Sequence, residues 1–113
     1  MSTVPEIKSD PIYQLLRTEK IAEFNERTAQ GESCDLRSSD FRGIDLRGLN
    51  ASGLDLRDCY FRQADLRGID FREALMEGSN IAGAKISGAY FPPELSADEL
   101  TLSLLHGTRM RYC

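Results

Sequence analysis

Large apolar residues recur at every fifth position through the middle of the chain, from Leu36 to Phe91, without a slip in register. Small or apolar residues also stand two places before each of them, and most of the positions between are polar or charged. A helix repeats about every 3.6 residues and a strand every second residue, so neither element alone produces this period. The predicted core positions at the centres of these units are Leu36, Phe41, Leu46, Leu56, Phe61, Leu66, Phe71, Met76, Ile81, Ile86 and Phe91, and the small Ala51 completes the series.

This pattern predicts a β solenoid in which each five-residue unit forms one side. Three alternating inward and outward positions make a very short strand, and the fifth residue, most often glycine, turns the corner. One unit cannot bury its own apolar pair, so stacked coils must bury these residues against each other. A shift of twenty residues places Phe41 on Phe61 and Phe71 on Phe91, which favours four sides per coil, although a shift of ten is also compatible.

The unit at 64–68, with the sequence ADLRG, resembles the A-(D/N)-L-x-x motif of the pentapeptide repeat proteins. Twelve such units follow one another in register over residues 34–93. The resemblance implies a right-handed quadrilateral β-helix with four pentapeptides per coil, hence three coils in this chain. The units that depart from the motif, at the position where it has Asp or Asn, carry Tyr60, Leu75, Lys85 and Tyr90. These departures alter the expected surface and not the expected fold.

The segment before the repeats, residues 1–33, lacks the five-residue period and predicts two short helices. The first begins with Asp10 as N-cap and Pro11 at its first position, which suits a residue without an N–H. Thr18 is the expected N-cap of the second helix, and Gly31 lies beyond its end. Solenoid ends expose apolar residues and unpaired strand edges, so this segment is expected to form an N-terminal helical cap.

The segment after the repeats, residues 94–113, predicts a helix and a tail. Ser96 and Glu99 have the spacing of a capping box, and Gly107 is the expected end of the helix. Two roles remain open for this leucine-rich segment. It either folds back to cap its own solenoid or contributes to a dimer or partner interface.

Arginine follows seven of the first eight repeat centres, where only Ser52 interrupts the series. The period-two geometry points these side chains outward, beside the aspartates that precede the centres. They form either a solvated lattice of alternating charge or a surface that docks an acidic protein or a nucleic acid. The repeats hold eight basic and nine acidic residues, a balance that argues against nucleic acid as a partner. The candidate charged surface consists of Arg37, Arg42, Arg47, Arg57, Arg62, Arg67 and Arg72.

The arginines stop after Arg72, and the last four units are less charged on their outward positions. This change predicts that the third coil and the C-terminal segment form an interface with a protein partner or with a second copy. The candidate interface consists of Tyr60, Leu75, Tyr90, Leu100, Leu104, Leu105, Met110 and Tyr112.

Composition adds few constraints on function. With 113 residues, 28% of them charged, and a net charge of −4, the chain is the size of one domain and carries no strong basic field. It has no apolar run long enough for a membrane span and no signal-peptide pattern, so we expect a cytoplasmic location. Cys34, Cys59 and Cys113 have the spacing of neither a metal site nor a disulfide framework. The single histidine, His106, has no evident catalytic partner.

We therefore expect no catalytic residues, no metal, no cofactor and no small-molecule ligand. The function that this sequence favours is a small protein–protein interaction or scaffold module, with a homodimer through the C-terminal end as one form of that role. The resemblance suggests an alternative, because some pentapeptide repeat proteins mimic DNA and modulate DNA gyrase. This chain departs from those long, acidic rods in its few coils and in its matched Asp and Arg positions.

Overall fold

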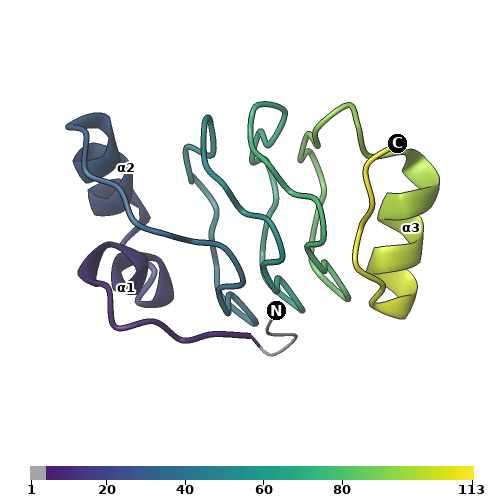
Figure 1. Cartoon of the computed structure of the whole chain (residues 1–113), viewed down its shortest axis with the longest axis horizontal. Helices are drawn as coiled ribbons and strands as arrows, with labels where there is room; N and C mark the ends of the chain where they lie inside the picture. Colours follow the sequence, from purple (N-terminus) through teal and green to yellow (C-terminus); the bar gives the residue numbers. More distant parts are fainter. Residues whose placement is uncertain (1–4) are drawn as a thin grey trace.

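The computed structural model describes residues 5–113, in which the repeats form a β solenoid with helices at both ends (Figure 1). Helices α1 (Pro11–Arg17) and α2 (Ile21–Ala29) lie together at one end of the stack. Helix α3 (Ala97–His106) and the chain terminus after it lie at the other end. None of these helices is both long enough and apolar enough to cross a membrane within the described residues.

Parallel β-bridges set the register of the stack. Each of the six bridges within the repeats joins residues twenty apart, as in the column Asp45, Asp65 and Lys85. Four five-residue units therefore separate neighbouring turns, and the shift of twenty expected from the phenylalanines is the one observed. The bridges are isolated because the chain turns after each short side. We call residues 34–53, 54–73 and 74–93 the first, second and third turns.

The apolar centres fill the interior of the solenoid. Nine of the eleven predicted core residues are at most 3% exposed, while Ile86 and Phe91 are half-buried. The ring of Phe61 stacks on that of Phe41 with centroids 5.3 Å apart, and Tyr13 of α1 lies 5.5 Å from Phe41 on the other side. Ile86 and Phe91 lie in the last turn, which no further repeat covers, whereas Met76 and Ile81 of the same turn are buried where the C-terminal segment contacts it.

The corners between units require a left-handed backbone. Gly48 turns with φ of 88°, a conformation that glycine adopts without strain. Ser38, Asp58 and Gln63 take the corresponding place in their units with φ near 60°, a conformation that is unfavourable for most side chains. The path of the solenoid therefore holds even where glycine is absent, because the bridges and the buried centres on either side hold the corner.

The N-terminal helices follow the sequence signals in part. The Asp10 carboxylate accepts hydrogen bonds from the N–H groups of Ile12 and Tyr13, as expected of an N-cap. The prediction that Thr18 caps the second helix is wrong. Thr18 ends α1 and its hydroxyl donates to the Gln14 carbonyl, so α2 begins later, after Lys20, with no side-chain cap.

Helix α3 has the predicted boundaries, and both of its ends are capped. The Ser96 hydroxyl accepts a hydrogen bond from the Glu99 N–H, and Gly107 ends the helix with φ of 70°. The second bond of a capping box, in which the Glu99 carboxylate would accept from the Ser96 N–H, is not formed. The Glu99 carboxylate instead accepts from the Arg111 N–H, which ties the tail to the start of the helix.

The N-terminal segment closes the first turn by supplying the acceptors that a preceding turn would have supplied. In the second and third turns, six of the eight N–H groups that directly precede a centre donate to a carbonyl of the turn before. In the first turn three such N–H groups donate to residues outside the repeats. They are Asp40 to the Glu6 carbonyl at 2.9 Å, Asp45 to the Glu19 carboxylate at 2.7 Å, and Asn50 to the Asn25 side-chain oxygen at 2.9 Å.

The C-terminal segment closes half of the third turn in the same way. Four backbone N–H groups that would donate to a fourth turn find acceptors in α3 and the tail. They are Met76 to the Tyr112 hydroxyl at 2.8 Å, Gly78 to the Met110 carbonyl at 2.6 Å, Ile81 to the Ser103 hydroxyl at 3.0 Å, and Gly83 to the Leu104 carbonyl at 3.0 Å. The C-terminal segment therefore folds back onto its own solenoid along residues 76–83.

Candidate interaction surface

The outward arginines are held by the aspartates of their own units. In the unit centred on Phe41, the Asp40 carboxylate accepts hydrogen bonds from the backbone N–H, Nε and Nη2 of Arg42, at 3.0, 3.0 and 2.9 Å. The same three-contact arrangement recurs wherever Asp and Arg flank a centre. The six pairs are Asp35–Arg37, Asp40–Arg42, Asp45–Arg47, Asp55–Arg57, Asp65–Arg67 and Asp70–Arg72.

These pairs shift the pKa values of the carboxyl groups downward. Hydrogen bonds from Arg67 lower the pKa of Asp65 to about 2, and those from Arg72 lower the pKa of Asp70 to about 2. The Nε of Arg47 also lies 3.4 Å from the Asp65 carboxylate, which links the first turn to the second. The paired charges cancel locally, so the repeats present neither a basic nor an acidic column.

Acid is expected to destabilise the protein between about pH 4 and pH 2. An unfolded aspartate has a pKa of about 3.9, and the folded values of Asp65 and Asp70 lie below it. Their ion pairs therefore stabilise the fold above about pH 4, and this contribution is lost as the pH falls through about 2. Thermal unfolding followed by circular dichroism at pH 6, 4, 3 and 2 measures this loss.

The double variant Asp65→Asn, Asp70→Asn provides the control for this pH dependence. It should have a lower midpoint at pH 6 and a smaller decrease between pH 4 and pH 2. The remaining decrease comes from the other paired aspartates, whose pKa values are also lowered. A midpoint in the parent protein that stays constant over this range would contradict the assignment.

Arg62 differs from the other arginines of the columns. The residue before its repeat centre is Tyr60, so the unit has no aspartate to accept its hydrogen bonds. The Arg62 side chain is exposed, and it makes no hydrogen bond or ion pair within residues 5–113. The sequence contains the signal for this difference, which is the tyrosine at a position that the motif gives to Asp or Asn.

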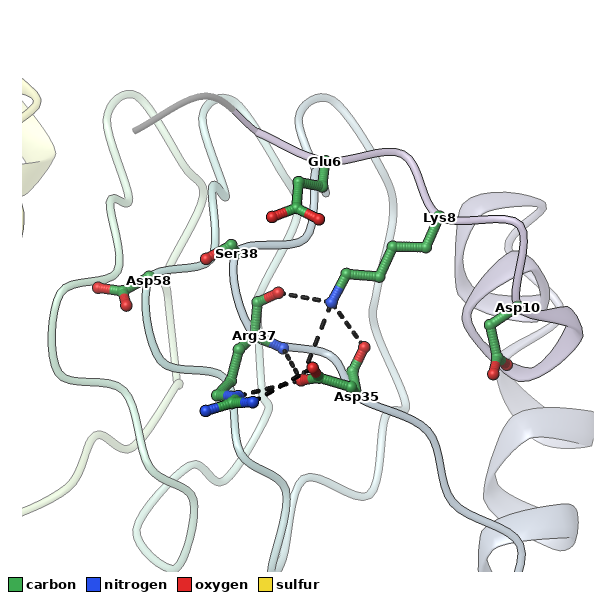
Figure 2. Close-up of a pocket in the computed structure, with 7 residues that line it drawn as sticks. All are labelled: Glu6, Lys8, Asp10, Asp35, Arg37, Ser38 and Asp58. Carbon is green, nitrogen blue, oxygen red and sulfur yellow. Dashed lines mark hydrogen bonds and ion pairs between the residues drawn. The ribbon is translucent and has the colours of Figure 1, made fainter. Parts of the chain in front are cut away.

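A depression of about 520 Å³ lies where the N-terminal segment crosses the first turn (Figure 2). The Lys8 ammonium group points into it and donates to the carbonyl oxygens of Asp35 and Arg37, each at 2.6 Å. The Asp58 carboxylate at the edge of this depression pairs with Arg109 from the C-terminal tail. These charged groups have partners within the chain, so the depression is a place where the two ends of the protein are tied to the solenoid.

The predicted interface residues separate into exposed and covered groups. Leu75, Tyr90 and Leu105 are 46%, 57% and 68% exposed, and the guanidinium of Arg72 lies 4.6 Å from the Tyr90 ring centroid. The placement of Met110 in an interface is wrong, because this side chain is fully buried against the chain's own core. The half-buried members of the predicted interface are Tyr60, Leu100, Leu104 and Tyr112.

The other half of the third turn lacks the closure that residues 76–83 receive. The backbone N–H groups of Ile86, Gly88 and Phe91 have no acceptor within residues 5–113. The carbonyl groups of Ala84 and Ala89 likewise accept no hydrogen bond from the described residues. We call residues 84–91 the open edge. Pro93 ends it, because proline has no N–H to continue the row of donors.

The residues that close the two ends were not found by pattern analysis. Lys8, Glu19 and Asn25 lie outside the repeats, and Ser103 is a polar residue on a leucine-rich helix. Their roles depend on where the end segments meet the solenoid, which no local spacing records. Within residues 5–113 the structure contains no group of three or more His, Cys, Asp or Glu residues arranged to hold a metal ion.

Stacked five-residue sides, buried centres and terminal helices define the molecule as a repeat protein of the β-solenoid class. The family model for pentapeptide repeats matches eight copies, within residues 32–63 and 55–91. The chain belongs to the pentapeptide repeat family. No curated protein and no solved structure gives a significant match to the chain.

Proposed function

We propose that the protein is a non-enzymatic cytoplasmic interaction module built on a right-handed quadrilateral β-helix of three coils. The observation that carries the proposal is the open edge at residues 84–91. Backbone donors and acceptors without partners can pair with the backbone of another chain, as an exposed strand edge does. Exposed Tyr90 and Leu75 add apolar surface on the outward positions of the same turn.

The three segments of the chain have distinct roles in this proposal. Residues 1–33 serve as the N-terminal cap, residues 34–93 as the rigid β-helix, and residues 94–113 as a cap over one half of the last turn. The C-terminal segment thereby limits docking to the half that it leaves open. A second copy of the chain is the simplest partner for this edge, because two-fold symmetry would pair it with an identical edge.

Mimicry of DNA directed at DNA gyrase is the alternative that family resemblance suggests, and the charge arrangement favours the interaction module over it. DNA mimicry needs rows of uncompensated negative charge. Here an arginine of the same unit neutralises each of the six aspartates in the pairs described above.

A photo-reactive benzoylphenylalanine at position 87 is expected to form a cross-link with the partner of the open edge. Ser87 is exposed and stands between the unpaired N–H groups of Ile86 and Gly88, so a docked chain lies within reach of this side chain. The full-length variant is irradiated in native lysate and in pure solution. Adducts are then separated by mass.

The same photo-reactive residue at Thr101, an exposed position on α3, is the matched control. An adduct of twice the monomer mass from pure protein identifies a second copy as the partner. An adduct found only in lysate identifies a different protein. Yields at position 87 that do not exceed those at position 101 in either setting would contradict the proposed role of the open edge.

A further inference from the structure

Arg62 has the same setting as its neighbours in the arginine columns except that its carboxylate is missing. In six other units the arginine is held by an aspartate two residues earlier, through the backbone N–H, Nε and Nη2. The Arg62 guanidinium therefore has five N–H donors that no described residue uses. Arginine presents these donors in a planar fork that matches a carboxylate in two-point contact.

Arg62 lines a depression of about 270 Å³ between the second turn, the third turn and the end of α3. Gln63, Gly83, Leu105 and His106 contribute to the same depression, and none of its lining residues is acidic. Four other depressions on the described surface are each lined by at least two carboxylates. On a chain with a net charge of −4, this depression is thus a local site that favours an anion.

The fold holds the cationic and apolar parts of this depression in place. The Gly83 N–H donates to the Leu104 carbonyl at 3.0 Å, and the Asn80 side chain donates to the Gly107 carbonyl at 2.8 Å. These bonds attach the end of α3 to the third turn. Leu105 nevertheless remains 68% exposed, so an apolar side chain without cover lines the same depression as a guanidinium without a partner.

We propose that this depression docks an acidic peptide segment of a partner protein, with a partner carboxylate on Arg62 and an adjacent apolar side chain against Leu105. The partner carboxylate supplies Arg62 with the negative partner that an aspartate supplies to the arginine of a regular unit. The inference rests on the interaction role proposed above but concerns a surface separate from the open edge. It narrows the partner chemistry to a carboxylate next to an apolar residue.

The test uses a fluorescein-labelled pentapeptide of alternating aspartate and leucine, with an asparagine–leucine peptide as the neutral control. Fluorescence anisotropy with the full-length protein should detect binding of the acidic peptide only. Arg62→Gln should weaken that binding about tenfold or more, since it removes a charged two-point contact. Arg37→Gln makes the same charge change in a different depression and should alter the affinity little.

Substitutions at position 60 test the missing carboxylate directly. Tyr60→Asp restores the pattern of the regular units, so Arg62 should pair within the chain and peptide binding should be lost. Tyr60→Asn removes the ring without adding a charge and should retain binding. Leu105→Ser should weaken binding while leaving thermal stability unchanged, because the side chain is mostly exposed.

Several results would overturn the inference. These are absence of acidic-peptide binding, equal binding of the neutral peptide, an Arg62→Gln affinity equal to that of the parent, and tighter binding of a single-stranded oligonucleotide. Cross-linking from position 87 separates the two proposals, because Arg62→Gln leaves the open edge unchanged. If the parent protein does not bind the acidic peptide but cross-links from position 87, only the proposed Arg62 site is wrong, whereas if it binds the peptide but does not cross-link, only the proposed role of the open edge is wrong.

Discussion

Replacing Phe61 by alanine is expected to lower the free energy of unfolding by about 3–5 kcal/mol. Phe61 is fully buried in the second turn, with the Phe41 ring stacked at 5.3 Å and the Phe71 ring tilted at 6.4 Å. Turns on both sides pack against it, so the stack cannot collapse easily into the space left by the ring. A change of this size is a large part of the total stability of a small domain.

Urea unfolding followed by circular dichroism measures the effect of Phe61→Ala. Phe91→Ala is the matched control, because it removes the same ring from the last turn, where the side chain is only half-buried. We expect a clearly smaller loss of stability at Phe91, although its ring also stacks on Phe71, at 5.6 Å. Equal losses at the two positions would contradict the view that cover from both sides makes the middle turn the most tightly packed.

Removing residues 94–113 is expected to destabilise the chain by about 3–6 kcal/mol and to promote aggregation. The estimate comes from the lost burial of Leu95 and Met110, each worth about 1.5–3 kcal/mol. The deletion also strips the acceptors from four N–H groups along residues 76–83, which lengthens the uncovered edge. A long uncovered edge favours pairing between chains.

Urea unfolding and light scattering on the shortened chain measure both effects. Met110→Ala in the full-length chain tests the same closure if the shortened chain is insoluble, with an expected loss of about 2–5 kcal/mol. Leu102→Ala is the control, because this α3 side chain is 42% exposed. If the shortened chain remained monomeric and as stable as the parent, the C-terminal segment would not be a cap.

Most of the solenoid could be predicted from the repeats because each unit encodes its own local path. Phe41, Phe61 and nine other centres were assigned from spacing alone, and only Ile86 and Phe91 are less buried than the rest. These two have the same motif position as the others. Their exposure arises because no turn follows them and the C-terminal segment covers only the half of the last turn that holds Met76 and Ile81, which is a property of the whole stack and not of the unit.

The candidate surface could be predicted less completely. The arginine columns and the change after Arg72 are visible in the sequence, but the covering of Met110 by the chain's own core is not. Helix and tail signals in residues 94–113 are compatible with either folding back or docking elsewhere. The choice depends on hydrogen bonds between segments that lie about thirty residues apart, such as Gly78 to Met110.

By itself, the sequence determined the five-residue period, the identity of the inward residues and the alternation of aspartate and arginine, because these are set by contacts within one unit or between identical units. The tertiary structure alone decided which half of the third turn is closed and which half stays open. It also decided that Arg62 lines a depression together with the end of α3. Both outcomes arise where non-repeating segments meet the ends of the stack. There the acceptors come from distant residues such as Glu19 and Ser103, whose positions no periodic pattern specifies.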